Sequence, residues 1–233
     1  MTTHIKQMAV EIERLLDQNE WHLAIPLLKQ VAAEGDPWGD YMLGLAYHYG
    51  QGIRRSRKQA EKWYRRAAVR KYDSAILNLG LLFATSRPPR YAEAFKQFRQ
   101  AAQLGNRNAM YNLGLYYELG RHVNPNRRTS FRWYKKAAEL GDDESQCIVG
   151  YCYHEGVGVK RDNKQGIYWY RRSARAGNPA ACYNLGLSYR DGNGVRQNLK
   201  QALEWFKRGV ELGHEEAKQR LEEMARDYIA CKP

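Results

Sequence analysis

Two related stretches decide the fold of this sequence: YNLGLYYELG, Tyr111–Gly120, and YNLGLSYRDG, Tyr183–Gly192. Similar stretches begin at Tyr41 (YMLGLAYHYG), Leu77 (LNLGLLFATS) and Cys147 (CIVGYCYHEG). Their shared glycines are spaced by 36, 34, 36 and 36 residues, at Gly44, Gly80, Gly114, Gly150 and Gly186. A period of this length predicts a repeat protein in which each unit is one antiparallel pair of helices, helix A and helix B.

A second motif marks helix B of each unit. A tryptophan follows four of the glycines by 19 residues, in WYRRAA, WYKKAA, WYRRSA and WFKRGV: Trp63, Trp133, Trp169 and Trp205. The second unit is two residues shorter and has Gln97 at this place, in QFRQAA. The units end at Lys71, Gly105, Gly141, Gly177 and Gly213. Glycine is favoured there because it tolerates the left-handed conformation at a helix C-terminus.

Between helix A and helix B, three units have a Gly-x-Gly sequence, which begins at Gly50, Gly156 or Gly192. Loops of this composition bind phosphate or calcium in some proteins, but a phosphate loop has no reason to recur at fixed spacing. A calcium loop needs Asp or Asn at alternate positions and a closing Glu, which these loops lack. We therefore predict turns that join two helices.

Small residues recur where two helix backbones are expected to approach each other. They lie five positions before the helix A glycine and three before the tryptophan position: Gly39, Ala75, Ala109, Ser145 and Ala181, and Ala60, Ala94, Ser130, Gly166 and Ala202. Asp36-Pro37 and Asn178-Pro179 supply a capping side chain followed by proline in the first helical turn. The predicted fold is all-α, a right-handed α-solenoid of antiparallel helix pairs.

The sequence predicts a single solenoid without a second domain. Residues 1–35 are a degenerate N-terminal helix pair, in which Ala24, Leu28 and Ala32 have helix B spacing. Five repeats follow, at 36–71, 72–105, 106–141, 142–177 and 178–213. Residues 214–233 form a capping helix, with Ala217 and Leu221 at helix A spacing and a polar remainder.

These motifs together resemble the Sel1-like repeat (SLR) family, a branch of the tetratricopeptide-type α-solenoids. The resemblance covers residues 36–213 and rests on the elements small-x(3)-Leu-Gly-x(2)-Tyr, Gly-x-Gly and Trp-Tyr-x(2)-Ala-Ala. It implies an adaptor, scaffold or regulator without catalysis, and some bacterial members resemble immunity proteins that block toxins. The second repeat departs from the pattern by losing its loop glycines and its tryptophan, so we expect local distortion there.

The composition is that of a soluble, folded protein, with 43% hydrophobic and 27% charged residues. No apolar run approaches the roughly 20 residues of a membrane helix. The N-terminal segment MTTHIKQMAVEIERLLDQ has an amphipathic helix pattern and not that of a signal peptide, so we expect a cytoplasmic protein. Cys147, Cys152, Cys182 and Cys231 lack metal-ligand spacing, which predicts reduced thiols.

One face of helix A is the predicted partner-binding surface. Positions −6, −3, −2, +1, +4 and +5 around the helix A glycine lie on the side away from helix B, and in similar tetratricopeptide proteins this is the concave, peptide-binding side. The candidate groove residues are Trp38, Tyr41, Asn78, Tyr111, Asn112, Glu118, Tyr151, His154, Tyr183, Asn184 and Arg190. An Asn at position −2 has donors and acceptors for a peptide backbone. The alternative is that the Tyr and Asn positions pack against the next repeat.

The net charge of +13 favours an acidic partner. Part of the basic excess lies in the turns between helices, where stacking is expected to gather it into a basic edge: Arg54, Arg55, Arg57, Lys58, Arg87, Arg90, Arg127 and Arg128. An acidic protein surface and a nucleic acid are the two partners that such an edge attracts. No residue recurs as a base-reading code, which disfavours sequence-specific RNA binding.

No catalytic, metal or cofactor motif stands out. The segment HEEAK at His214 lacks the second histidine of a zinc-binding HExxH helix, and no serine nucleophile elbow is present. The sequence therefore predicts a non-enzymatic protein-binding adaptor, scaffold or regulator without cofactors. Its sharper form is an immunity-type inhibitor of an acidic toxin or enzyme, and its alternative is a nucleic-acid-associated protein.

Overall fold

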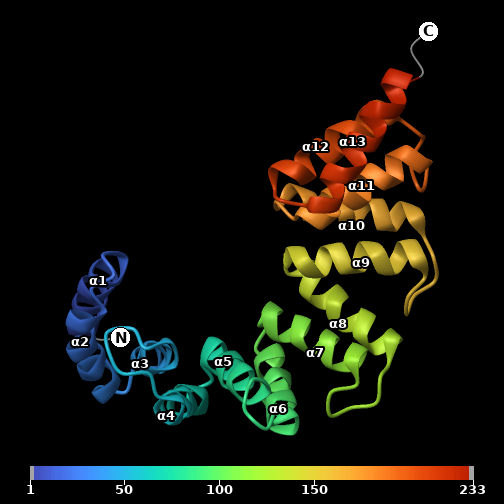
Figure 1. Cartoon of the computed structure of the whole chain (residues 1–233). Helices are drawn as coiled ribbons and strands as arrows, with labels where there is room; N and C mark the ends of the chain where they lie inside the picture. Colours follow the sequence, from blue (N-terminus) through green and yellow to red (C-terminus); the bar gives the residue numbers. More distant parts are fainter. Residues whose placement is uncertain (1–2, 231–233) are drawn as a thin grey trace. The chain divides into compact units, whose positions relative to one another are not determined.

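The computed structural model describes residues 3–230, and the regular secondary structure in this range is α-helical (Figure 1). Helix bounds run in chain order: α1 Thr3–Asp17, α2 Trp21–Ala33, α3 Pro37–Tyr49, α4 Arg57–Val69, α5 Asp73–Ala84, α6 Tyr91–Gln103, α7 Arg107–Leu119, α8 Arg127–Glu139, α9 Asp143–Glu155, α10 Asn163–Arg175, α11 Pro179–Asp191, α12 Leu199–Glu211 and α13 Glu215–Ala230. Within these residues there are thirteen α-helices and no strand, which confirms the all-α prediction.

The chain forms two compact units, one up to Ala109 and one from Met110 onward. In the first unit, α3 packs on α4, and α5 packs on α6. In the second unit, α9 packs on α10, and α11 on α12. Each of these pairs is the helix A and helix B of one predicted repeat. The assignment of the whole chain to a single solenoid stays a prediction.

The glycine of each helix A lies against an aromatic ring of helix B in the same repeat. The rings belong to the residue that follows the tryptophan position, and all are fully or almost fully buried: Tyr64, Phe98, Tyr134, Tyr170 and Phe206. A methyl group added at Gly114 would lie 2.5 Å from the Tyr134 ring, and one at Gly80 would lie 2.7 Å from the Phe98 ring. No other residue fits between helix A and the ring without displacing it.

The small residues also lie where the sequence predicts close helix contact. All five residues at position −5 are buried, and so are the five that precede the tryptophan position by three. The hydroxyl of Ser130 donates a hydrogen bond of 2.9 Å to the carbonyl of Gly114, across the two helices of the third repeat. A methyl group at Gly166 would lie 3.1 Å from the carbonyl oxygen of Gly150. The prediction is confirmed at both sets of positions.

The Gly-x-Gly sequences are turns, as predicted, and their two glycines have different tasks. The first ends helix A in the left-handed conformation, with φ 79° at Gly50, 76° at Gly156 and 74° at Gly192. The second lies against the backbone that begins the preceding helix B. A methyl group at Gly158 would lie 2.7 Å from the carbonyl carbon of Arg127, and one at Gly194 would lie 2.5 Å from the carbonyl oxygen of Asn163. The turn therefore also docks one repeat on the one before it.

Helix ends follow the predicted capping pattern. The Asp36 side chain accepts a hydrogen bond of 2.8 Å from the Trp38 amide, and the Asn178 side chain accepts one of 3.0 Å from the Ala181 amide. Lys71 replaces the terminal glycine of the first repeat and still has the left-handed conformation, with φ 59°.

The chain ends pack as the repeat pattern predicts. In the first unit α1 packs on α2, and Ala24, Leu28 and Ala32 are buried. In the second unit α13 packs on α12 through the buried Ala217. Among the cysteines, Cys147, Cys152 and Cys182 are buried free thiols, whereas Cys231 lies outside the described residues.

The contact between helix A and the ring predicts a specific energetic coupling. We expect Gly114→Ala to lower the free energy of unfolding by about 2 kcal/mol, because the added methyl overpacks the space against Tyr134. Urea unfolding followed by circular dichroism measures this loss. In a double-mutant cycle with Tyr134→Leu, the combined loss should be smaller than the sum of the single losses. Simple additivity would contradict the contact.

The second loop glycine predicts a loss that conformation alone does not cause. We expect Gly158→Ala to lower the free energy of unfolding by about 3 kcal/mol, from left-handed strain and from the clash with the Arg127 backbone. Gly177→Ala is the matched control, since Gly177 has φ 94° but no atom within 4 Å of the added methyl. This control should lose only about 1 kcal/mol. Equal losses for the two variants would show that the docking contact is unimportant.

Candidate functional site

The tyrosines predicted at position −3 of the groove are largely engaged within the stack. The Tyr41 ring lies 6.2 Å from the Tyr64 ring of its own repeat and 5.2 Å from Tyr72, which precedes the next helix A. The Tyr183 ring lies 5.9 Å from Phe206 and stacks on His214 at 4.7 Å. Tyr72 and His214 occupy equivalent places, so both tyrosines link neighbouring repeats. The structure thus supports the packing alternative at these two positions.

The asparagines at position −2 also bond to the preceding repeat. The Asn78 amide donates to the Tyr41 hydroxyl at 3.4 Å, and the Asn184 amide lies 3.8 Å from the Cys147 sulfur. Tyr41 and Cys147 both occupy position −3 of their repeats. Asn112, at the third such position, is half-buried and also has an interaction partner. These amides form contacts between repeats, which leaves fewer of their donors for a peptide.

The other groove residues differ widely in exposure. Trp38 is half-buried against the hydrophobic core of α1–α3, and Tyr111 is half-buried with its ring 5.7 Å from Tyr134. His154 bonds to the neighbouring Glu155 at 2.8 Å, and Arg190 pairs with Asp191 at 2.7 Å.

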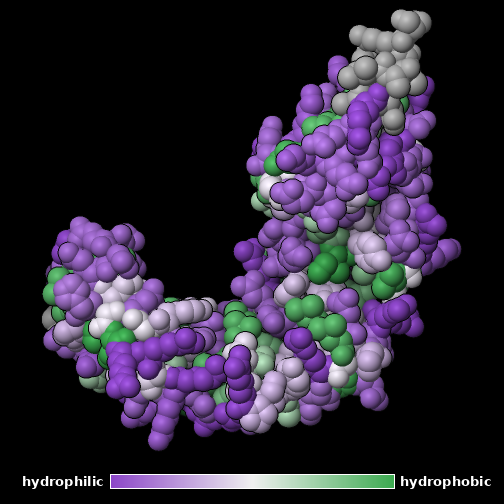
Figure 2. All heavy atoms as spheres, in the orientation of Figure 1, coloured by the Kyte–Doolittle hydropathy of each residue, from purple (hydrophilic) through white to green (hydrophobic). Residues whose placement is uncertain are grey.

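Two of the predicted groove residues, Glu118 and Tyr151, are exposed and lie in one cavity of the second unit. Its volume is about 350 Å³, and it lies between the ends of α7 and α9 and the first turns of α8. Phe131, Ile148, Cys152 and Val157 give it an apolar lining, while the polar side chains are Glu118, Arg127, Ser130, Tyr134 and Tyr151. Figure 2 shows apolar side chains at the surface over α7–α9, among hydrophilic neighbours. The cavity is the candidate functional site.

Buried groups of this cavity keep their protons. The Tyr134 hydroxyl donates a hydrogen bond of 2.5 Å to Glu118, and burial together with this carboxylate raises the pKa of Tyr134 well above its usual value. Burial, with a smaller contribution from Glu118, raises the pKa of the Cys152 thiol to about 11. At neutral pH neither group is a nucleophile. The cavity therefore offers an apolar surface, a carboxylate and an arginine for binding.

The apolar lining of the cavity is not among the residues that the sequence motifs predict. Phe131 belongs to neither repeat motif, yet the equivalent positions hold Phe95, Ile167 and Leu203. That apolar recurrence is the signal that could have found it.

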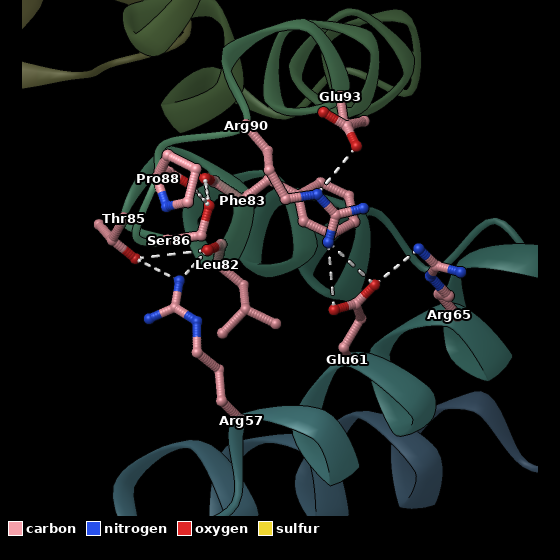
Figure 3. Close-up of polar contacts among 10 residues, drawn as sticks. All are labelled: Arg57, Glu61, Arg65, Leu82, Phe83, Thr85, Ser86, Pro88, Arg90 and Glu93. Atoms are coloured by element: carbon pink, nitrogen blue, oxygen red, sulfur yellow. Dashed lines mark hydrogen bonds and ion pairs between the residues drawn. The ribbon is translucent and has the colours of Figure 1, made fainter.

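Two residues of the predicted basic edge are engaged inside the first unit (Figure 3). Arg90 pairs with Glu61 at 3.3 Å and Glu93 at 2.8 Å, and its guanidinium lies 4.2 Å from the centre of the Phe83 ring. Arg57 donates hydrogen bonds to the Leu82 carbonyl and, at 3.1 Å, to the Thr85 hydroxyl. These contacts hold the shortened turn of the second repeat against the first repeat.

The remaining residues of the basic edge are exposed. They are Arg54, Arg55, Lys58 and Arg87 in the first unit, and Arg127 and Arg128 in the second. Arg127 and Arg128 line an open groove of about 670 Å³ together with Arg132 and Lys160. The structure therefore brings together only part of the predicted edge, within the second unit.

Two arginines, one in α4 and one at its C-cap, pair with a buried carboxylate outside the predicted site residues. Asp40 is fully buried at the start of α3, where Arg66 approaches it at 3.3 Å and Arg70 at 3.1 Å. Burial raises the pKa of Asp40 in spite of both arginines. A carboxylate four positions before the helix A glycine occurs in no other repeat, which is the signal that could have found it.

Among the residues that the structure describes, no three or more His, Cys, Asp or Glu side chains are grouped to hold a metal ion. Of the described helices, none combines the length and apolar character needed to span a bilayer.

Comparison with known proteins identifies relatives of this arrangement. The Sel1 repeat family model matches residues 39–68, 73–106, 107–142, 143–178 and 179–214. The structure is similar to a protective antigen of uropathogenic Escherichia coli that displays an SLR fold, with a TM-score of 0.85 and 28% identity over 94% of this chain and 48% of that chain. It is also similar to a Sel1 repeat protein of Oxalobacter formigenes, with a TM-score of 0.80 and 27% identity over 92% of this chain and 86% of that chain. These findings confirm the α-solenoid fold.

Two further similarities are partial or more distant. An uncharacterized protein of Neisseria meningitidis serogroup B is 34% identical over 44% of this chain, a match that spans 21% of that protein. An immunity protein of Pseudomonas aeruginosa shares the fold at 15% identity, with a TM-score of 0.56 over 92% of this chain and 84% of that chain. This chain thus spans about half the length of the E. coli relative and a smaller share of the meningococcal one.

The buried thiols predict slow chemical labelling of the folded protein. In a Cys231→Ser background, we expect an aromatic disulfide reagent at pH 7 to label Cys147, Cys152 and Cys182 only after unfolding. All three are buried, and burial raises the pKa of the Cys147 thiol to about 12 and that of Cys152 to about 11. Absorbance of the released thiol measures the rate, with and without denaturant. Fast labelling of Cys152 in the native state would contradict the burial of this thiol.

Proposed function

Because the chain belongs to the Sel1 repeat family, we propose that it is a non-catalytic adaptor that binds a partner protein through the Tyr151 cavity. Sel1 repeat proteins generally mediate protein–protein interactions. The proposal places the contact at the cavity that residues of α7, α8 and α9 line.

The observation that carries this proposal is the half-exposed ring of Tyr151. It is 50% exposed on the wall of a cavity that Phe131 and Ile148 line. Tyrosines beside such apolar cavities are typical anchors of protein interfaces, because a ring and its hydroxyl supply both apolar area and a hydrogen bond. Glu118 and Arg127 supply charges of both signs at the same wall, which suits a polypeptide that enters with an apolar side chain.

The overall charge indicates which partners reach this site. A net charge of +13 attracts acidic proteins and speeds their encounter at low ionic strength. The finer form of the proposal is that the chain neutralises an acidic toxin or enzyme, and the fold shared with the Pseudomonas immunity protein is compatible with this. We place the protein in the cytoplasm, where its three buried cysteines would stay reduced.

A nucleic-acid-associated protein is the second candidate. The exposed Arg54, Arg55 and Lys58 in one turn of the first unit favour it, because a phosphate backbone attracts such a cluster without sequence preference.

One experiment separates the two candidates. A tagged chain is used to capture partners from a native lysate, with and without nuclease, and the captured material is analysed by mass spectrometry. The proposal expects a stoichiometric protein that survives nuclease. Capture of nucleic acid alone, lost with nuclease or moderate salt, would overturn it in favour of the second candidate.

With the captured partner in hand, Tyr151→Ala tests the cavity directly. We expect the variant to weaken binding by about tenfold or more, since a buried tyrosine anchor contributes upward of about 1.4 kcal/mol. Leu140→Ala is the matched control, because Leu140 is 51% exposed at the opposite end of α8. Isothermal titration calorimetry measures both affinities. Unchanged affinity for Tyr151→Ala would remove the cavity from the proposal while leaving the adaptor role intact.

A further inference from the structure

The second unit carries two similar grooves, each between a helix B and the turn of the next repeat. The first has a volume of about 670 Å³ and lies between the start of α8 and the turn after α9. The second has a volume of about 370 Å³ and lies between α10 and the turn after α11. The equivalent residues are 36 positions apart: Arg128 and Lys164, Phe131 and Ile167, Arg132 and Tyr168, Gly158 and Gly194, and Val159 and Val195. The grooves therefore repeat with the period of the fold.

Both grooves combine an apolar floor with a basic rim. Phe131 and Val159 line the first, and Ile167 and Val195 line the second. Their charged lining residues are all cationic: Arg127, Arg128, Arg132 and Lys160 in the first, and Lys164, Arg171, Arg172 and Arg175 in the second. The close docking of Gly158 on the Arg127 backbone brings Lys160 to the same groove as the α8 arginines.

No acidic side chain among the described residues lies within 4 Å of these rim cations. Arg171 instead donates to the Tyr189 hydroxyl at 2.7 Å, and Arg172 lies 5.0 Å from the centre of the Trp169 ring. These contacts hold the two guanidinium groups in place without neutralising them. The rims thus keep a concentrated positive charge beside an apolar surface.

The position of Arg127 and Arg128 is unfavourable for the helix itself. They are the first two residues of α8, where the helix dipole is positive and a carboxylate would be stabilising. The first turn of α10 holds Lys164 and no acidic residue, although the N-cap Asp162 accepts a hydrogen bond of 3.0 Å from the Gln165 amide. A local arrangement that breaks a stability rule without an evident structural gain is expected at binding sites.

The equivalent place in the first unit, at the start of α4, has a different composition. Arg57 and Lys58 begin α4 there, and the position of Phe131 is taken by Glu61. Arg90 from the next turn pairs with this Glu61, and Arg57 bonds to the end of α5 (Figure 3). At this place Glu61 pairs with both Arg65 and Arg90, so part of the local positive charge is neutralised. The unneutralised rims are thus a property of particular repeats and not of the repeat pattern.

From this contrast we propose that the two grooves together bind one extended, acidic segment of a partner protein. Its carboxylates pair with the basic rims, and its apolar side chains lie on Phe131 and Ile167. The proposal rests on the proposed function in taking the occupant to be a protein, but it adds a second contact site beside the Tyr151 cavity. The apolar floors favour a polypeptide over a nucleic acid, whose phosphates would use the rims alone.

A defined probe tests the proposal without knowledge of the partner. The probe is a fluorescein-labelled 12-residue peptide of repeated Glu-Leu-Glu-Glu, whose fully extended length is about 40 Å. Two comparison probes are the same peptide with Ser for Leu and a 12-nucleotide oligothymidylate. Fluorescence anisotropy at near-physiological salt gives the affinities. We expect the leucine peptide to bind more tightly than either comparison probe.

Charge reversal then locates the binding. We expect Arg128→Glu/Arg132→Glu to weaken binding of the leucine peptide by about tenfold, and Lys164→Glu/Arg175→Glu to do the same. The control Arg54→Glu/Arg55→Glu makes an equal change in net charge on the exposed turn of the first unit and should weaken binding less than about twofold. Equal losses in all three variants, or oligothymidylate as the tightest probe, would overturn the proposal. So would equal binding of the serine and leucine peptides.

Misfolding is separated from loss of the site by the melting temperature. Arg128→Glu places a carboxylate in the first turn of α8, so the double reversal should not lower Tm. If it does, Arg128→Gln/Arg132→Gln removes the charges without reversing them and decides the question through the same titration. Failure of the proposed function gives a different result, the absence of a nuclease-resistant protein in the capture experiment.

Discussion

The fold depends on one contact that recurs in every repeat, the packing of an aromatic ring of helix B against the glycine of helix A. A ring in direct contact with helix backbone sets the distance and the rotation between the two helices. Small residues on both sides of this contact let the backbones stay close along their length. The tryptophan of the helix B motif varies more in burial, since Trp169 is buried and Trp63 is half-buried.

A second glycine contact fixes the position of each repeat on the one before it. Gly52, Gly158 and Gly194 each lie against the backbone at the start of the preceding helix B, so each turn has a fixed place on the previous repeat. The grooves of the second unit follow from this docking, because the same turn that touches the helix start also walls the groove. In the second repeat the turn lacks glycine, and the hydrogen bonds of Arg57 replace the backbone contact.

The fold could be predicted from the sequence because the residues that determine it lie within one repeat. Glycine, small residues and capping side chains recur at fixed positions, and each position has one physical task. The binding surface was less accessible, because the partners of a side chain depend on the neighbouring repeat. The helix A pattern predicts that Asn78 and Tyr41 face away from helix B. In the structure the Tyr41 ring lies 6.2 Å from Tyr64 of helix B, and the two residues bond to each other between repeats. Phe131 could not be predicted as a cavity residue from the two motifs, because it belongs to neither.

The partners of the basic residues likewise depend on the neighbouring repeat and not on the repeat motif. Arg66 and Arg70 form ion pairs with the buried Asp40, and Arg90 forms one with Glu61. Part of the positive charge of the first unit is therefore used in contacts within the fold. No described carboxylate pairs with Arg128 or Arg132, although both lie on α8, the helix that corresponds to α4. Charge that stabilises no internal partner and opposes a helix dipole contributes little to folding. These arginines can instead attract an external anion. The apolar floor of the groove then favours an anionic ligand that also carries hydrophobic groups.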